Sequence, residues 1–267
     1  MIEKTLKAGK GEIVKYLRFS HNNEIKYGIL EKDDIILELE GDYGSYPGHH
    51  KHPLSQCKIL MPCLPSKIVA VGLNYTDHAK ELKMPVPEEP VLFIKPSTSV
   101  IGSGDKIIFP KMCAQLGYEG EVAIVIKKVC RYITPEKANE YILGITCFND
   151  VTARDLQKKD GQWTRAKSFD TFSPLGPFIA SGLNLADIAV ELRLNGQVKQ
   201  SASTKNLIFP IPQLVSFISR VMTLLPGDVI TTGTPPGVGT MKVGDTVEVT
   251  IPGVGTLKNN VIGESNV

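Results

Sequence analysis

The sequence predicts a β-rich α+β fold, with a small N-terminal strand domain ahead of a larger domain. Short strand-type runs separated by turn residues recur along the chain, and residues 211–224 show the clearest helical spacing of apolar side chains. The 24 glycines and 18 prolines among 267 residues also favour many tight turns. We place the two domains at residues 1–64 and 65–267.

The predicted N-terminal domain consists of short strands followed by a linker. The strand-type runs lie at residues 12–19, 24–30 and 34–40. Residues 41–56 are polar and rich in Gly, His and Pro, so this segment is expected to be the linker. Its histidines are His49, His50 and His52. Because no carboxylate or cysteine joins them at ligand spacing, a solvated loop is favoured over a metal site.

The larger domain is expected to combine many strands with a few helices. Strand-type runs cover residues 67–72, 91–96, 121–129, 143–150, 227–233 and 244–262. Helical patterns cover residues 75–82, 134–142, 151–160 and 211–224. Asn195-Gly196 stands between two alternating runs, and this dipeptide predicts a β-hairpin over residues 188–204.

Composition excludes several classes of protein. The net charge of +2 argues against a nucleic-acid-binding surface, which normally carries a basic excess. No apolar run approaches the ~20 residues that span a bilayer, so no membrane partner is expected. The N-terminal stretch lacks the apolar core of a signal peptide. The five cysteines are odd in number and lack C-x-x-C spacing, which favours reduced thiols and a cytoplasmic location.

Glu119 and Glu121 stand two positions apart at the start of an apolar strand. Residues i and i+2 share a face of a strand, at a Cα separation of about 6.5–7 Å, so the two carboxylates can converge and repel each other. A divalent cation would remove the repulsion, and Asp150, at the end of a later strand, is the natural third ligand. The same pattern on a solvated strand needs no metal, so the residues alone leave both interpretations open.

His78 and Glu81 lie three positions apart on a predicted helix and share a face. A carboxylate beside an imidazole fixes its tautomer and raises its basicity, as in a general base. An exposed histidine beside an incidental glutamate has the same spacing. Gly233 and Thr234, in a Gly/Pro-rich segment, form either a simple turn or a binding site for a substrate carboxylate.

Five segments then identify a family resemblance. They occur in the order VGLNYTDHAKEL, YEGEVAIVI, FNDVTARDLQ, AKSFDTFSPLGPFI and TGTPPGVG. Together they closely resemble the fumarylacetoacetate hydrolase family, from about Lys67 to about Val261. The layout is most similar to the acylpyruvase, oxaloacetate decarboxylase or tautomerase, and hydroxyheptadienedioate isomerase branches. The resemblance implies a mixed β-sandwich roll and a homodimer.

The resemblance also implies functional roles for particular residues. An Mg²⁺ or Mn²⁺ ion would be held by Glu119, Glu121 and Asp150. A water-activating pair on a lid segment would consist of His78 and Glu81. Lys167 matches a family lysine that reaches the active centre. Further candidates for substrate contact are Arg154, Gln157, Tyr118 and Lys95, together with Gly233 and Thr234.

The expected substrate is a small 2-oxo or 2,4-dioxo acid that reacts through a metal-bound enolate. Attack of water on a distal ketone would cleave a C–C bond, loss of a carboxylate would be decarboxylation, and reprotonation alone would be tautomerisation or isomerisation. The His78–Glu81 pair favours the hydrolase. The alternatives are the other reactions of the family, a non-catalytic metal- or ligand-binding module, and a β-rich structural protein.

Overall fold

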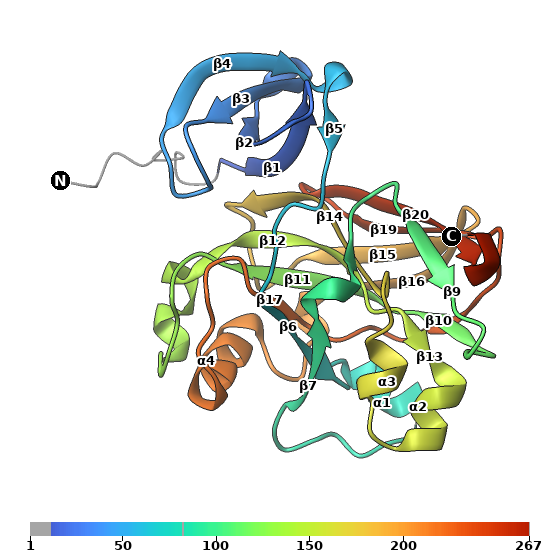
Figure 1. Ribbon diagram of the computed structural model, residues 1–267. Helices are drawn as coiled ribbons and strands as arrows, with labels where there is room; N and C mark the ends of the chain where they lie inside the picture. Colours follow the sequence, from blue (N-terminus) through green and yellow to red (C-terminus); the bar gives the residue numbers. More distant parts are fainter. Residues whose placement is uncertain (1–11, 82, 267) are drawn as a thin grey trace.

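The computed structural model describes residues 12–81 and 83–266 (Figure 1). The expectation about a signal peptide falls mainly on residues 1–11, which lie outside the described residues. Strands dominate the architecture, and helices are few and short. The predicted β-rich α+β class is therefore confirmed.

The N-terminal strands form one end of a long sheet. They are β1 (Val14–His21), β2 (Glu24–Leu30), β3 (Ile35–Leu39), β4 (Pro47–Pro53) and the short β5 (Lys58–Ile59). β1 pairs antiparallel with β14 (Ser173–Ser181), and Tyr16 lies opposite Ile179. The sheet thus continues from the strands at the top of Figure 1 into the larger part of the molecule. The domain boundary between residues 64 and 65 stays a prediction.

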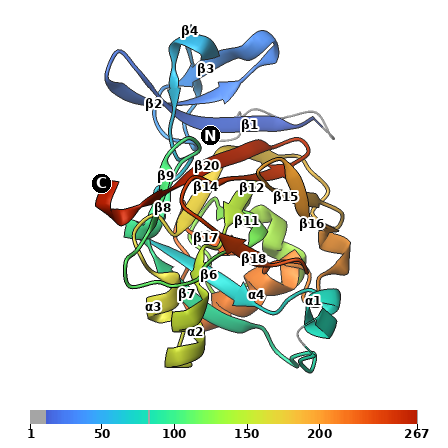
Figure 2. The ribbon, with the colours of Figure 1, turned by 90° about the vertical axis from the view of Figure 1, so that its right-hand side faces the viewer.

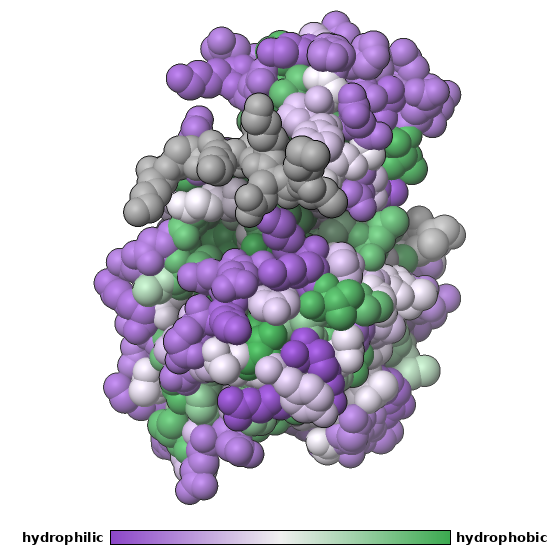
Figure 3. Space-filling view, turned by 90° about the vertical axis from the view of Figure 1, so that its left-hand side faces the viewer, coloured by the Kyte–Doolittle hydropathy of each residue, from purple (hydrophilic) through white to green (hydrophobic). Residues whose placement is uncertain are grey.

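The linker expected at residues 41–56 is wrong in part, because Pro47–Pro53 forms β4. This edge strand pairs with β3, and it begins and ends with proline. Its central His49 and His50 are exposed, so the segment lacks the apolar alternation by which a strand is recognised. On the face drawn in Figure 3, mainly hydrophilic residues cover these N-terminal strands, which lie at the top of the view.

The larger part of the same sheet carries β14, β12, β11, β17, β6 and β7 in that spatial order. The further bounds are β6 (Lys67–Gly72), β7 (Val91–Pro96), β8 (Val100–Ile101), β11 (Gly120–Ile126), β12 (Ile142–Asn149) and β17 (Val229–Thr231). β11 and β12 are buried almost throughout, which agrees with their continuous apolar sequences.

Two smaller sheets complete the architecture. The five-stranded one has the order β16-β15-β19-β20-β9 and the three-stranded one the order β13-β10-β18. Their bounds are β9 (Lys106–Phe109), β10 (Leu116–Tyr118), β13 (Thr152–Ala153), β15 (Ala189–Leu194), β16 (Gln197–Ser203), β18 (Gly239–Met241), β19 (Thr246–Ile251) and β20 (Gly255–Gly263). One apolar core joins Ile124 and Ile145 of the long sheet to Val190 and Val249 of the five-stranded sheet. This is the predicted sandwich.

The hairpin predicted from Asn195-Gly196 is confirmed. β15 ends at Leu194 and β16 begins at Gln197, so these two residues form the turn. Their φ angles are 51° and 78°, both in the left-handed region that a two-residue type I′ turn requires.

The helices gather around one end of the sandwich. Their bounds are α1 (Thr76–Glu81), α2 (Arg154–Asp160), α3 (Thr164–Lys167) and α4 (Ile211–Val221). The helix expected at residues 134–142 is a 3₁₀ segment, Pro135–Glu140. In Figure 2, α1 lies on one side of the lower half and α2 with α3 on the other. None of the described helices combines the length and apolar character that crossing a membrane demands.

Candidate active site

Three buried carboxylates meet where β11 begins and β12 ends. Gly120 pairs with Asn149 across the ladder, so Glu119 and Glu121 flank that pair on one strand and Asp150 follows it on the other. A carboxylate oxygen from each residue lies within 4.8 Å of the other two. The relative exposures of Glu119, Glu121 and Asp150 are 7%, 1% and 1%. The sheet register therefore brings the three acidic residues of the predicted set together.

Three cationic side chains compensate two of these carboxylates. Lys167 Nζ lies 2.8 Å from Glu119 Oε2 and 2.7 Å from Asp150 Oδ2. On the other oxygen of each acid, Arg154 Nη1 lies 2.5 Å from Glu119 Oε1 and Lys95 Nζ lies 2.5 Å from Asp150 Oδ1. Lys95 also donates to the carbonyl of Val151 over 3.1 Å. Both oxygens of Glu119 and of Asp150 thus have a cationic donor.

Glu121 has a different environment. Its Oε2 accepts a hydrogen bond of 2.8 Å from the backbone N–H of Gly233, and among the described residues no lysine or arginine forms an ion pair with it. Burial, together with the charges of Asp150 and Glu119, raises the pKa of Glu121 well above its usual range. Burial also opposes ionisation of Glu119, but Arg154 and Lys167 outweigh it and lower the pKa of Glu119 to about 2.

The cluster fits a hard divalent cation. One of its three buried carboxylates has no cationic partner among the described residues, and a cation between the three would supply one. Carboxylate oxygens are the ligands that Mg²⁺ and Mn²⁺ prefer. The donor set and the uncompensated charge of Glu121 therefore both match the ion that the resemblance implies.

The two buried lysines differ in their electrostatics. Burial lowers the pKa of Lys95 to about 8, and the attraction of Asp150 only partly offsets this effect. Burial also acts against the charge of Lys167, but Asp150 and Glu119 outweigh it and raise the pKa of Lys167. Lys167 therefore stays an ammonium ion at neutral pH, at a position from which it can face an anionic ligand.

His78 and Glu81 of α1 form a hydrogen-bonded pair. His78 Nδ1 lies 2.8 Å from Glu81 Oε2, and His78 is 7% exposed. Glu81 also accepts a hydrogen bond of 3.1 Å at Oε1 from the backbone N–H of Gly237. The carboxylate therefore holds Nδ1 as a donor, which leaves Nε2 as the nitrogen that can accept a proton.

A cavity of about 550 Å³ lies beside the carboxylates, between α1 and the α2–α3 pair. The predicted site residues that line it are His78, Glu119, Glu121, Arg154, Gln157, Lys167 and Thr234. Arg154 Nη1 donates to Gln157 Oε1 over 3.2 Å, so these two side chains form one polar wall. His78, two of the three candidate ligands and the polar wall therefore face one space.

Other predicted residues lie around this cavity without lining it. Lys95 and Asp150 are buried behind Glu119, and the N–H of Gly233 contacts Glu121. Tyr118 is buried at the end of β10, where it pairs with Gly239 of β18. Their roles in binding a substrate stay predictions.

Sequence patterns did not indicate the aromatic wall of the cavity. Phe93 and Trp163 both line it, and their rings meet edge to face with centroids 5.2 Å apart. Lys167 Nζ lies 5.0 Å from the centroid of Phe93. Trp163 lies shortly before the motif that begins at Ala166 and contains Lys167, and this proximity was the available signal. Phe93 lies on a strand with no functional pattern.

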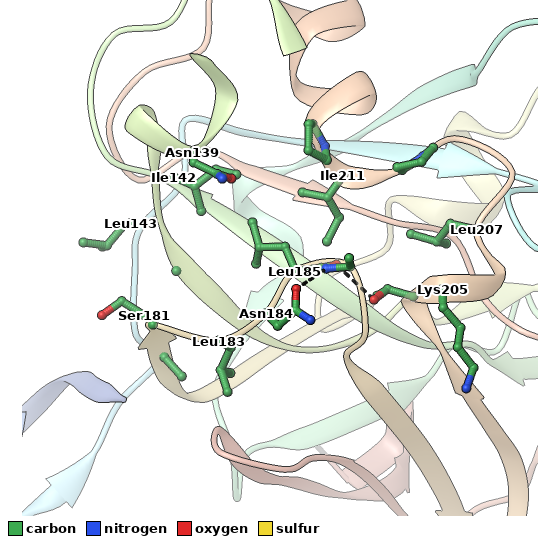
Figure 4. A pocket seen from close by; sticks show the side chains of 17 residues that line it. Asn139, Ile142, Leu143, Ser181, Leu183, Asn184, Leu185, Lys205, Leu207 and Ile211 are labelled. Atoms are coloured by element: carbon green, nitrogen blue, oxygen red, sulfur yellow. Dashed lines mark hydrogen bonds between the residues drawn. The ribbon is translucent and has the colours of Figure 1, made fainter. Parts of the chain in front are cut away.

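A second cavity, of about 670 Å³, lies near the start of α4 (Figure 4). Its walls are mainly apolar and include Leu183, Leu185, Leu207 and Ile211. Of its described lining residues, Lys205 is the one with a charged side chain. Among its described lining residues, this cavity therefore has no counterpart to the carboxylates and His78 that line the first cavity.

Two family models match this chain. Residues 67–262 match the family model described as fumarylacetoacetate (FAA) hydrolase C-terminal, and residues 14–62 match the model described as Rv2993c-like, N-terminal. An uncharacterized protein from Archaeoglobus fulgidus is 56% identical over 245 residues, which are 92% of this chain and 95% of that protein.

Two further similarities concern proteins with stated activities. Oxaloacetate tautomerase FAHD2A, mitochondrial, from Bos taurus is 40% identical over 223 residues, which are 79% of this chain and 71% of that protein. The crystal structure of 5-carboxymethyl-2-hydroxymuconate delta-isomerase from Mycobacterium smegmatis superimposes with a TM-score of 0.88 at 42% identity. That match covers 94% of this chain and 100% of the other.

Proposed function

Because the chain belongs to the fumarylacetoacetate hydrolase family, we propose that it is a divalent-metal-dependent hydrolase of acylpyruvate-type 2,4-dioxo acids. The reaction adds water across a C–C bond, so that acetylpyruvate would give acetate and pyruvate. The observation that carries the proposal is the hydrogen bond between His78 and Glu81, because His78 is buried and lines the same cavity as Glu119 and Glu121.

The candidate metal ligands are Glu119, Glu121 and Asp150, and the ion is Mg²⁺ or Mn²⁺. When bound, such an ion stabilises negative charge on the carboxylate and 2-oxo group of a substrate. Lys95 donates a hydrogen bond to Asp150, and Lys167 donates to both Asp150 and Glu119. The two lysines therefore fix the orientation of these carboxylates.

The charge of the cluster supports a dianionic substrate. With all three acids ionised, as metal ligation would require, the three carboxylates equal in number the three cationic side chains of Lys95, Arg154 and Lys167. A divalent ion leaves two positive charges in a buried place, where uncompensated charge is costly. The enolate of a 2-oxo acid carries two negative charges and would restore the balance.

His78 has the geometry of a general base. Glu81 fixes the proton on Nδ1, so Nε2 can take a proton from a water molecule as that water attacks the distal carbonyl. Glu81 then stabilises the imidazolium that forms. Lys167 and Arg154 line the same cavity and can hold developing negative charge on the substrate.

A second candidate function is keto–enol tautomerisation of oxaloacetate. The similarity to oxaloacetate tautomerase FAHD2A favours it, because that protein shares 40% identity over most of this chain. In that reaction His78 would move a proton between carbon and oxygen, and no bond between carbons would break. The same side chains serve both reactions, so the substrate decides between them.

The test is a panel of oxaloacetate, acetylpyruvate and an unsaturated dioate, each assayed with Mg²⁺ and with Mn²⁺. Release of pyruvate, release of CO₂ and keto–enol conversion are measured separately. The proposal predicts pyruvate release from acetylpyruvate that EDTA abolishes. Fast tautomerisation of oxaloacetate without pyruvate release from acetylpyruvate would establish the second candidate instead. Metal binding without turnover of any substrate would indicate a binding module.

A further inference from the structure

The start of β11, next to Glu119 and Glu121, lacks a strand partner on one edge. β17 pairs with β11 only as far as Thr231 opposite Ala123. Beyond that point Thr232 still donates from its backbone N–H to the carbonyl of Val122 over 3.0 Å. At Gly120, between the two glutamates, the backbone N–H and C=O on this edge have no backbone partner among the described residues. Buried backbone groups of this kind need substitutes.

The side chain of Gln200 supplies one of these substitutes. Gln200 lies in the middle of β16, only 2% exposed, and its Oε1 accepts a hydrogen bond of 2.9 Å from the Gly120 N–H. Its Nε2 donates over 2.8 Å to Thr234 Oγ1 and over 2.8 Å to the carbonyl of Pro235. Thr234 Oγ1 in turn donates to the Gly120 carbonyl over 3.2 Å. Gln200 and Thr234 thus replace the missing strand at both backbone groups of Gly120.

The position of Gly120 shows how closely β11 approaches this part of the five-stranded sheet. A Cβ atom at Gly120 would lie 2.9 Å from Leu192 Cβ and 3.3 Å from Gln200 Oε1. Any side chain there would push β11 away from Gln200. A glycine between the two glutamates therefore allows β11 to pack against Leu192 and allows the amide of Gln200 to reach its backbone.

β16, which carries Gln200, also contacts the segment around Gly237, and this segment donates a hydrogen bond to Glu81. At Gly237 a Cβ atom would lie 2.2 Å from the carbonyl oxygen of Lys199, so this segment packs directly on the backbone of β16. Gly237 has a φ of 95° and donates its N–H to Glu81. Residues 199 and 200 of β16 therefore contact both β11, beside the candidate metal ligands, and the segment around Gly237 that binds Glu81.

We propose that Gln200 is a positioning residue that fixes the Glu119–Glu121 strand against the Thr234–Gly237 segment. It holds the two candidate ligands and the partner of His78 in one geometry, without touching substrate. The proposal rests on the proposed function in taking Glu119 and Glu121 as metal ligands. The contacts of Gln200 themselves are independent of the reaction.

The test compares Gln200→Met with Gln200→Glu. Methionine keeps the length of the side chain but makes none of the three hydrogen bonds, whereas glutamate keeps the acceptor for Gly120 and lacks the donor for Thr234 and Pro235. We expect amide exchange at residues 118–122 of the metal-free protein to be at least about tenfold faster in Gln200→Met. Mn²⁺ affinity should fall about 10- to 100-fold in Gln200→Met and less in Gln200→Glu.

Two control variants separate positioning from general destabilisation. Gln197→Met changes an exposed glutamine at the start of the same strand and should alter neither measurement. Val190→Ala removes buried volume from the adjacent β15, so it should lower thermal stability. It should not accelerate amide exchange specifically at residues 118–122. Circular dichroism checks that each variant is folded. If Gln200→Met does not fold, amide exchange and Mn²⁺ affinity are measured on Gln200→Glu and test the proposal instead.

The outcomes distinguish this inference from the proposed function. Unchanged exchange at residues 118–122 in a folded Gln200 variant would overturn the positioning role, whatever the activity. Faster exchange with unchanged Mn²⁺ affinity would mean that Gln200 makes only a structural contact. This result would also overturn the positioning role. A wild-type protein that binds no Mn²⁺ would refute the metal-dependent function. The exchange measurement would still show whether Gln200 holds residues 118–122 in place.

Discussion

The backbone N–H of Gly233 donates to Glu121 Oε2 over 2.8 Å, and it is a neutral donor to a carboxylate that stands beside two others. Glu119 and Asp150 each have cationic partners at both oxygens. Repulsion in the cluster is therefore concentrated on Glu121. This asymmetry makes Glu121 the residue whose neutralisation should separate metal binding from stability.

Glu121→Gln should weaken metal binding without destabilising the metal-free protein. The amide oxygen of glutamine can still accept from Gly233, and the loss of charge relieves the repulsion by Asp150 and Glu119. We expect thermal stability in EDTA equal to or above that of the wild type. Mn²⁺ affinity, measured by calorimetry, should fall more than about 100-fold. Glu140→Gln, at a side chain 61% exposed, is the control. A clear loss of stability in EDTA would contradict the electrostatic argument.

His78→Gln should affect hydrolysis more than decarboxylation. A general base contributes about 10²–10⁴-fold to a rate, and only the hydrolytic route needs a water to be deprotonated. We expect kcat for acetylpyruvate to fall within that range, while CO₂ release from oxaloacetate falls much less. His50→Gln, at an exposed histidine of β4, is the control. Equal losses on both substrates would remove the separate role of His78 in activating water.

Asp228 should make stability depend on pH in the acidic range. Burial raises its pKa, but hydrogen bonds from Lys67, Ser66 and the Leu225 N–H outweigh this effect and lower the pKa below 3.8. A lowered folded-state pKa means that the ionised form stabilises the fold above pH 3.8, and that this contribution is lost as the pH falls through the folded-state pKa.

Asp228→Asn should therefore reduce the free energy of unfolding by about 2–3 kcal/mol near neutral pH, since hydrogen bonds to a charged group are lost. The difference from the wild type should shrink below pH 3.8, where Asp228 also becomes protonated. Urea denaturation at several pH values measures this. Asp77→Asn, whose side chain is 58% exposed, should show little difference at any pH. A difference that grows as the pH falls would have the wrong sign.

Local patterns predicted much of the fold. β2, β6 and β7 have the bounds that their apolar runs indicate, because each run is set off by turn residues or proline. Asn195-Gly196 identified its hairpin because few residues other than Asn, Asp and Gly accept left-handed angles in succession. β4 was not predicted, because an exposed edge strand has no buried face to impose alternation.

The site shows the same division between local and distant information. Strand geometry accounts for the convergence of Glu119 with Glu121, but it carries no information on which cations compensate them. Lys167 lies 48 positions from Glu119, and Gln200 lies 80 positions from Gly120. The first contact depends on where α3 packs beside the long sheet, and the second on how the two sheets pack. The family resemblance indicated that Lys167 reaches the active centre, but its contact with Glu119 and the whole role of Gln200 required the three-dimensional structure.

Gly117→Ala offers a way to move Arg154 without mutating it. A Cβ atom at Gly117 would lie 2.6 Å from Arg154 Nε and 3.1 Å from its Cγ, so the side chain of Arg154 would have to shift, and we expect its guanidinium to move away from Glu119. Gly117 lies in β10 outside the left-handed region, so alanine adds no backbone strain. Lys167 still compensates Glu119, and we expect the loss of stability to stay below about 1.5 kcal/mol.

The kinetic effect of Gly117→Ala should fall on KM, because Arg154 lines the cavity where a carboxylate substrate would bind. We expect KM for acetylpyruvate to rise about 10-fold or more, which corresponds to the loss of one charge-assisted hydrogen bond. The decisive comparison is a double-mutant cycle with Arg154→Ala. If alanine at residue 117 acts only by displacing this guanidinium, it should have no further effect once the guanidinium is absent. Additive effects in the double variant would mean that residue 117 acts by another route, and the proposed contact of Arg154 with substrate would lose its support.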